Sequence, residues 1–128
     1  MITQQEIMKG DTLPSGLEDN YDKLFERINK FRAAYGKPMR VTSGYRSLND
    51  HIRIYSEKGI NNPPMGSLHL KCLAIDILDR DCMLKHFIVN NIRLVEEIGL
   101  WFEDFSVTPN WVHFQVEPPK SYKRFFLP

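Results

Sequence analysis

Cysteine, long apolar runs and an excess of either charge are all scarce in this chain of 128 residues. Cys72 and Cys82 are too few for the disulfide framework of a small secreted domain, so we expect two reduced thiols. No apolar run approaches the roughly 20 residues that cross a bilayer, which argues against membrane insertion. A formal charge of +1 also argues against a nucleic-acid-binding protein.

Internal repeats, low-complexity tracts and linkers are absent as well. The first residues, Met1–Glu6, lack the basic start and apolar stretch of a signal peptide, so we expect synthesis in the cytoplasm without a Sec signal. The length fits one domain over residues 1–128, and we expect it to be a monomer. A hydrophobic fraction of 42% is enough for a real core.

Hydrophobic periodicity predicts where the helices and strands lie. The clearest pattern repeats every three or four residues over Tyr21–Tyr35. It predicts a helix that follows an irregular lead-in at 1–16, begins with a Ser15–Glu18 capping box and ends at Gly36. The other predicted elements are strands at 40–43, 73–78, 100–102 and 111–116, helices at 48–57, 79–91 and 93–98, and a loop at 58–67.

Alternation along two of these strands sorts their side chains onto two faces. Asp76 lies on one face of the strand 73–78 with Ala74 and Leu78. Leu73, Ile75 and Ile77 lie on the other face. His113 similarly faces away from its apolar neighbours on the strand 111–116. If the strands are neighbours, Asp76 and His113 point into one cleft. The apolar faces then pack on the helices, which predicts an α+β fold: a small, mostly antiparallel sheet with helices on one face.

Residues 120–128 are predicted to be mostly irregular. Their apolar side chains are expected to fold back on the core, namely Phe125, Phe126 and Leu127.

His69, Asp76 and His113 are the most informative residues of the chain. Two imidazoles and one carboxylate make a three-ligand zinc set, and catalytic zinc sites keep a further position open for water. Such a set leaves the metal a net positive charge, which acidifies bound water and polarises a carbonyl. The alternative interpretation is a polar loop histidine and a helix-capping aspartate.

Three motifs place these residues in a wider pattern, and through them the chain resembles the zinc D-alanyl-D-alanine carboxypeptidases. That family includes phage endolysin peptidases and shares its fold with the hedgehog signalling domain. The resemblance runs from about residue 10 to the C-terminus, and the short form looks most like the small phage-encoded members. The motifs are Val41-Thr-Ser43-Gly44-Tyr45-Arg46-Ser47, Ser67-x-His69-x4-Ala74-x-Asp76 and Trp111-Val-His113.

The resemblance implies one Zn²⁺ per chain, held by His69, Asp76 and His113. It implies a peptidase that hydrolyses peptidoglycan stem peptides with metal-activated water, either as a D,D-carboxypeptidase or as an endolysin-type endopeptidase. A lysis enzyme of this kind would act at the bacterial cell wall. The alternative is a catalytically silent module of the same fold, stabilised by zinc, that serves for binding or in a phage structure.

The resemblance also suggests roles for residues around the metal. Arg46 would bind a substrate carboxylate or the oxyanion of a tetrahedral intermediate, because a guanidinium fork fits both. Tyr45 and Ser67 are expected to contact substrate. Glu103 is expected to be the catalytic acid–base group, with Asp104 as the other candidate.

Certain positions depart from the family pattern. Asn110 stands where many members carry a carboxylate, three residues before the last histidine, and it has no proton to exchange at neutral pH. Cys72 stands where the family usually has glycine, so the backbone there either avoids positive φ or places Cys72 in it at some cost. We do not expect Cys72 to be a fourth ligand, because that would close the site.

Three further polar residues have side chains that could bind or orient a ligand. Gln115 shares the face of His113 and is a candidate to orient a ligand. His51 and His86 lie outside the motifs and are expected not to bind metal.

Overall fold

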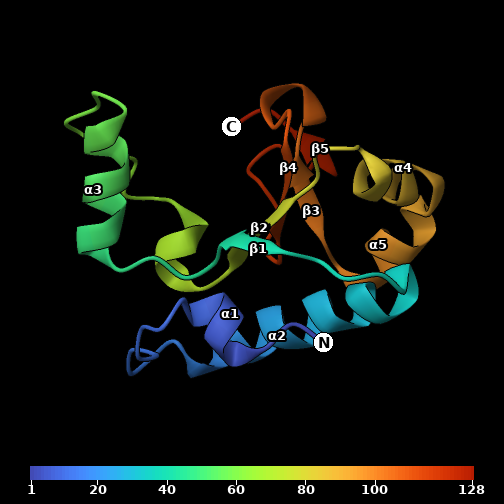
Figure 1. The fold of residues 1–128 in the computed structure, drawn as a ribbon, viewed down its shortest axis with the longest axis horizontal. Helices are drawn as coiled ribbons and strands as arrows, with labels where there is room; N and C mark the ends of the chain where they lie inside the picture. Colours follow the sequence, from blue (N-terminus) through green and yellow to red (C-terminus); the bar gives the residue numbers. More distant parts are fainter.

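A five-stranded sheet is the centre of the computed structural model, which describes residues 1–128 (Figure 1). Its strand order is β1-β2-β4-β3-β5. All neighbours are antiparallel except β3 and β5, which are parallel. The strands are β1 (Val41–Ser43), β2 (Ala74–Leu78), β3 (Trp101–Glu103), β4 (Trp111–Gln115) and β5 (Phe125–Phe126).

The helices lie around this sheet in three places. In Figure 1, α1 and α2 lie below the strands, α4 and α5 lie to the right, and α3 extends away from the body on the left. No helix combines the length and apolarity needed to cross a bilayer. The mostly antiparallel sheet and the helices around it confirm the predicted α+β class. The helices are α1 (Gln4–Met8), α2 (Glu18–Tyr35), α3 (Leu48–Glu57), α4 (Met83–Asn90) and α5 (Ile92–Ile98), with the 3₁₀ turns η1 (Leu68–Lys71) and η2 (Phe105–Val107).

The core joins the apolar stripe of α2 to one face of the sheet. Phe114 on β4 lies 5.0 Å from the ring of Phe31 on α2 and 5.0 Å from the ring of Phe102 on β3. Ile75 and Ile77 on β2 are fully buried beside them. Burying one such side chain contributes about 1.5–3 kcal/mol. The predicted alternation is confirmed, and the opposite face of β2 and β4 is left for polar side chains.

The predicted irregular lead-in is wrong, because α1 lies within it. Thr3 caps this helix by accepting a hydrogen bond from the Glu6 amide at 3.2 Å, and Glu6 bonds back to the Thr3 amide at 3.0 Å. This reciprocal pair stabilises a helix of only 5 residues, whose Ile7 and Met8 are buried in the core. Tertiary packing thus orders a segment too short to show helical periodicity.

The predicted Ser15–Glu18 capping box is also wrong. Helix α2 begins at Glu18 itself, and no side chain caps it at the preceding residue. The Glu18 carboxylate instead accepts a hydrogen bond from the Gly16 amide at 2.8 Å. The predicted end of the helix is confirmed, because Gly36 has the left-handed conformation with φ 74°.

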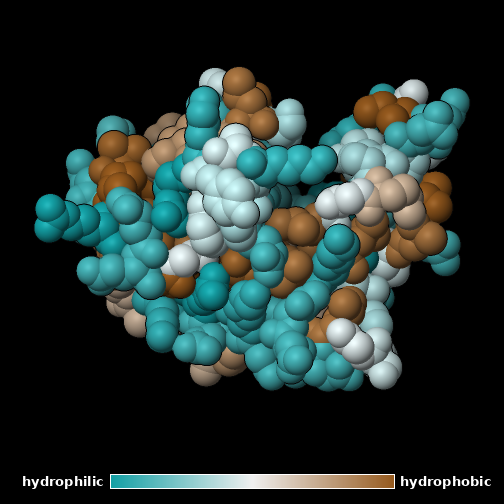
Figure 2. All heavy atoms as spheres, turned by 180° about the vertical axis from the view of Figure 1, so that it is seen from behind, coloured by the Kyte–Doolittle hydropathy of each residue, from teal (hydrophilic) through white to brown (hydrophobic).

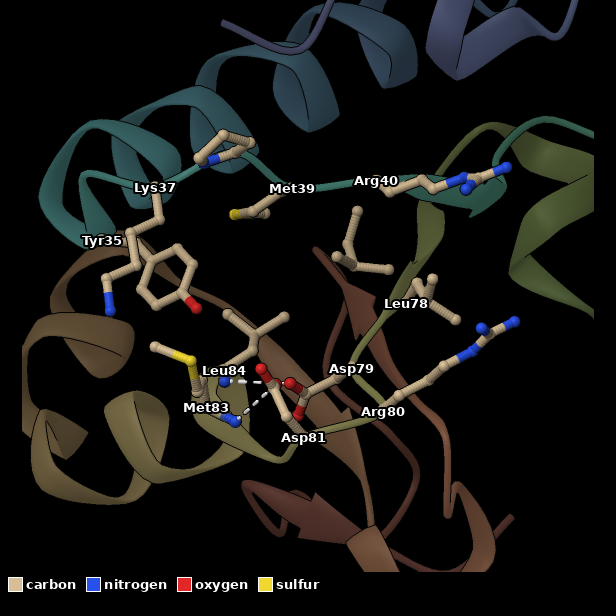
Figure 3. Close-up of a pocket in the computed structure, with 12 residues that line it drawn as sticks. Tyr35, Lys37, Met39, Arg40, Leu78, Asp79, Arg80, Asp81, Met83 and Leu84 are labelled. Carbon is tan, nitrogen blue, oxygen red and sulfur yellow. Dashed lines mark hydrogen bonds between the residues drawn. The ribbon is translucent and has the colours of Figure 1, made fainter.

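Helix α4 begins later than the predicted start at 79 or 81. Asp79 and Asp81 precede it and accept hydrogen bonds from its first amides, Leu84 at 3.0 Å and Met83 at 3.2 Å (Figure 3). These residues help line a surface pocket of about 380 Å³ between the end of α2 and the start of α4. The aspartates therefore satisfy helix amides from outside the helix, which explains why the sequence suggested an earlier start.

The C-terminal tail is more ordered than predicted. It forms β5 on the free edge of β3, where the Phe102 amide bonds to the Arg124 carbonyl at 2.9 Å and the Asp104 amide to the Phe126 carbonyl at 2.7 Å. Phe126 is buried as expected, but the expectation for Leu127 is wrong, since it is 71% exposed. The unpaired backbone groups of an edge strand explain the added strand.

The contact between α1 and the segment that follows β1 can be tested at Gly44. A methyl group at Gly44 would overlap the carbonyl of Ile7, which accepts the Tyr45 amide hydrogen bond at 2.8 Å. We expect Gly44→Ala to lower the free energy of unfolding by about 1–3 kcal/mol, as overpacking does. Gly66→Ala is the control, because a methyl group there meets no atom within 4 Å. Equal denaturation midpoints for the two variants would contradict this packing.

Candidate metal centre

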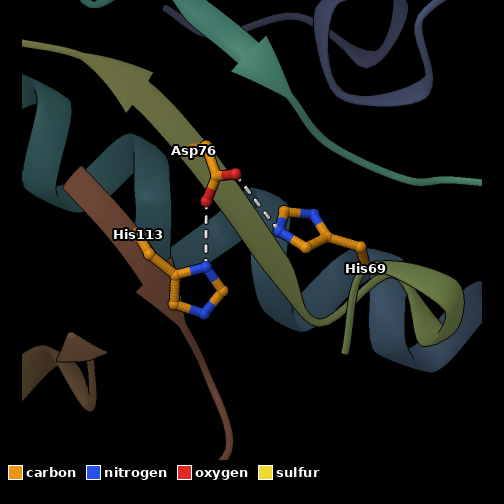
Figure 4. Close-up of side chains that lie close together, drawn as sticks. All are labelled: His69, Asp76 and His113. Atoms are coloured by element: carbon orange, nitrogen blue, oxygen red, sulfur yellow. Dashed lines mark hydrogen bonds and ion pairs between the residues drawn. The ribbon is translucent and has the colours of Figure 1, made fainter. Parts of the chain in front are cut away.

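Asp76 and His113 are direct partners across β2 and β4. Their side chains meet, with His113 Nδ1 2.9 Å from Asp76 Oδ1 (Figure 4). His69 comes from the separate turn η1, and its Nε2 lies 3.4 Å from Asp76 Oδ2. One ligand atom from each residue lies within 4.8 Å of the others. The structure therefore brings together the three residues that the sequence analysis selected.

The left-handed conformation of Cys72 ends the turn that carries His69. Its φ of 58° and ψ of 39° let the Leu73 amide bond to the Leu68 carbonyl at 3.0 Å. Of the two alternatives for this position, the chain takes positive φ without glycine, a conformation that costs about 1–3 kcal/mol. Cys72 is fully buried in the core, and burial raises the pKa of its thiol to about 11. Cys72 lies outside the ligand cluster.

Hydrogen bonds leave one nitrogen of each imidazole facing Asp76. His69 Nδ1 lies 2.8 Å from the Gly44 carbonyl oxygen, so Nδ1 carries the proton and Nε2 faces the cluster. His113 has the opposite arrangement: its Nδ1 faces Asp76 and its Nε2 lies 2.9 Å from Gln115 Oε1. All three cluster residues are largely buried, with 6–13% of their side chains exposed.

The charges of the cluster stabilise one another. Burial alone would raise the pKa of Asp76, but hydrogen bonds from His113 and His69 hold it well below its ordinary value. Burial alone would lower the pKa of His113, but its bond to Asp76 and the charges of Asp76 and Glu103 raise it. Two imidazole nitrogens and one permanently ionised carboxylate fit zinc, and three protein ligands are the number that catalytic zinc sites use.

A cleft of about 720 Å³ opens over these residues. Figure 2 shows a hollow between the projecting part of the molecule that carries α3 and the rest, on a largely hydrophilic face. Tyr55 and Lys58 line the cleft from the α3 side, and Lys120 and Phe126 line it from the C-terminal segment. None of these four residues can be identified from the sequence motifs, since no local pattern shows that segments more than 60 residues apart will face each other.

Arg46 and Ser67 both line the cleft. Arg46 donates from Nε to Ser43 Oγ at 3.1 Å, and its Nη2 lies 4.0 Å from Asp76 Oδ2. The guanidinium is thus held beside the ligand cluster. Tyr45 does not line the cleft and packs against the core.

Glu103 and Asp104 have different surroundings. Glu103 lines the cleft, and its Oε1 lies 3.9 Å from His113 Nδ1. The Asp104 carboxylate accepts hydrogen bonds from the amide and hydroxyl of Ser106, at 2.9 and 2.6 Å, at the start of η2. These bonds lower the pKa of Asp104. Of the two candidates, only Glu103 has its carboxylate beside the cluster.

The two remaining histidines lie outside the cluster. His51 is buried in α3, where its Nε2 lies 2.9 Å from the Pro64 carbonyl and joins the helix to the loop before His69. His86 is exposed on α4. Neither is placed to bind a metal held by the three cluster residues.

The raised pKa of His113 predicts how zinc affinity depends on pH. Zinc needs the neutral imidazole, so protons compete with it below the raised pKa, weakening binding about tenfold per pH unit for each proton displaced. The decline should begin above the ordinary histidine pKa of about 6.5. Asp76 does not add to the pH dependence of zinc affinity in this range, because its lowered pKa keeps it ionised. Competition titrations with a chromophoric chelator from pH 8 to 5 measure this.

Two variants sharpen this measurement. Glu103→Gln removes a charge that raises the pKa of His113, so the decline should begin at a lower pH. His86→Ala, on the exposed side of α4, should leave the curve unchanged. A zinc affinity that stays constant from pH 8 to 6 would contradict the predicted competition.

Comparison with known proteins places this centre in a family. No curated protein and no solved structure gives a significant match to the chain. A family model described as peptidase M15 matches residues 2–115, which is most of the chain. That range contains the ligand cluster, Arg46 and Glu103. The chain therefore belongs to the peptidase M15 family, whose members are zinc-dependent peptidases.

Proposed function

We propose that this protein is a zinc metallopeptidase that hydrolyses peptide bonds in peptidoglycan stem peptides. The observation that carries the proposal is the convergence of His69, Asp76 and His113 at an open cleft that Glu103 also lines. The family supports a zinc-dependent peptidase. The proposed substrate is supported by the likeness of the sequence motifs to the D-alanyl-D-alanine peptidases and by the cationic side chains of the cleft. Such a substrate implies action at the bacterial cell wall, as in a small phage-type endolysin.

Each residue of the centre has a distinct role in this proposal. When bound, zinc lowers the pKa of a water ligand and polarises a carbonyl group. His69, Asp76 and His113, which all line the cleft, would hold the metal there. Glu103 Oε1, at 3.9 Å from His113 Nδ1, is placed to take a proton and return it to the leaving amine. Asp104 is occupied by Ser106 and has no part in this transfer.

The cationic side chains of the cleft favour a substrate that carries carboxylates. Arg46 lies beside the cluster, and Lys58 and Lys120 come from opposite walls. In a carboxypeptidase, Arg46 would bind the terminal carboxylate of the substrate. In an endopeptidase, it would stabilise the oxyanion. Both uses need the planar guanidinium that Ser43 holds in place.

Incubation of the zinc-loaded protein with defined muropeptides tests the proposal, with product masses read by mass spectrometry. Loss of a single terminal residue would identify a carboxypeptidase, and separation of a crosslinked dimer an endopeptidase. His113→Ala is the inactive reference. If the zinc-loaded protein cleaves none of the muropeptides, the peptidase proposal is wrong and a silent binding module of the same fold replaces it.

Glu103→Gln tests the acid–base role. The change keeps the size of the side chain but removes its ability to exchange a proton, so turnover should fall about 10²–10⁴-fold while zinc stays bound. Asp104→Asn is the matched control on the next residue and should lower turnover much less. The roles would be exchanged if Asp104→Asn abolished turnover and Glu103→Gln left it near normal.

Arg46→Lys tests the need for a planar fork. Lysine keeps the positive charge but loses the two-pronged geometry, so kcat/KM should fall by about tenfold or more, with zinc content unchanged. Lys58→Arg is a control for altered cation shape at the rim of the cleft. Wild-type kinetics in Arg46→Lys would remove this residue from the site.

A further inference from the structure

The Nε2 atom of His113 has a dedicated hydrogen-bond acceptor in Gln115. The two residues are neighbours on the same face of β4, and Gln115 Oε1 lies 2.9 Å from His113 Nε2. Both are largely buried, with His113 7% and Gln115 6% exposed. Water therefore has little access to replace this bond.

The orientation of the Gln115 amide is fixed from its other end. Gln115 Nε2 donates to the main-chain carbonyl of Glu117 at 2.8 Å. A carbonyl only accepts, so the NH₂ group must point to Glu117 and the oxygen must point to His113. An oxygen at that position requires a proton on His113 Nε2. With the proton on Nε2 held by Gln115, Nδ1, which donates to Asp76 while the ring is protonated, is the nitrogen that becomes free to bind a metal when the ring loses a proton.

Contacts with α2 hold the backbone that anchors this amide. Arg27 Nη1 donates to the Val116 carbonyl at 3.0 Å, and the Val116 amide donates to the Leu73 carbonyl at 3.0 Å. Lys23 pairs with the Glu117 carboxylate at 2.8 Å. The Glu117 carbonyl therefore belongs to a segment that hydrogen bonds and an ion pair attach to both the sheet and α2.

We propose that Gln115 is a positioning residue for the metal centre: it keeps the proton on His113 Nε2 and aims Nδ1 at the metal. The inference rests on the proposed zinc site. His69 is held in the opposite sense by the Gly44 carbonyl and presents Nε2. The two histidines thus bind through different ring nitrogens, each chosen by the hydrogen bond on the other nitrogen.

Zinc affinity of three variants tests the inference without any peptide substrate. Gln115→Met removes the acceptor at similar size and should weaken zinc binding about 10–100-fold, the usual cost of losing such a partner. Gln115→Glu keeps an acceptor for Nε2–H of His113 and should weaken zinc binding less. Glu117→Gln breaks the pair with Lys23 but keeps the main-chain carbonyl and the bonds of Val116 to Arg27 and Leu73, so zinc affinity should fall much less than in Gln115→Met.

Three results would overturn the inference: wild-type affinity in Gln115→Met, an equal loss in Gln115→Met and Gln115→Glu, or an equally large loss in Glu117→Gln. Val112→Ala, on the buried face of β4, separates a general loosening of the strand from loss of the hydrogen bond. It should lower the stability of the metal-free protein but leave zinc affinity near the wild-type value.

A measurement on the wild type alone covers the case in which a variant does not fold. With ¹¹³Cd as the probe metal and ¹⁵N-labelled protein, NMR couplings should join cadmium to Nδ1 of His113 and Nε2 of His69. Coupling to Nε2 of His113, or no metal binding at all, overturns the inference. Binding through these nitrogens in a protein that cleaves no muropeptide supports the inference while the peptidase proposal fails.

Discussion

The pairing of Asp76 with His113 across β2 and β4 is the constraint on which the rest of the site depends. The register of two antiparallel strands places these residues directly opposite each other. A shift by one residue would turn Asp76 into the core and bring Ile75 or Ile77 to the polar face. The apolar alternation that packs against α2 therefore also sets the geometry of the metal centre, and selection for a stable core and for the site acts on the same register.

Main-chain carbonyls, rather than further charged side chains, orient the ligands around this pair. Gly44 directs its carbonyl at His69, and the Glu117 carbonyl fixes the amide that bonds to His113. A carbonyl is an acceptor in every protonation state, so each imidazole meets a fixed partner on the side away from Asp76. Asp76 is thus the only charged side chain shared by both rings, and its negative charge is retained because both rings stabilise it.

The scaffold accepts local strain and close approach to reach this arrangement. Cys72 takes a left-handed conformation that glycine usually adopts, and its side chain is buried in the core. Gly44 lies against the Ile7 carbonyl of α1, so a helix of 5 residues at the start of the chain supports the segment that holds His69. The walls of the cleft, by contrast, come from the α3 region and from the C-terminal segment, whose Phe126 belongs to the edge strand β5.

The sequence by itself determined the fold class, the two faces of β2 and β4, and the three residues of the cluster. The fold class and the two faces follow from local periodicity, which acts over a few positions along the chain. The three residues follow from residue chemistry together with the resemblance of their motifs to the zinc D-alanyl-D-alanine carboxypeptidases. Only the tertiary structure placed Glu103 beside His113 and Asp104 with Ser106, because adjacent carboxylates on one strand end are equivalent until the chain turns. Helix α1, strand β5, and the presence of Lys58 and Lys120 in one cleft were decided in the same way. They depend on contacts between distant segments, and a short segment carries too little periodicity to reveal its partner.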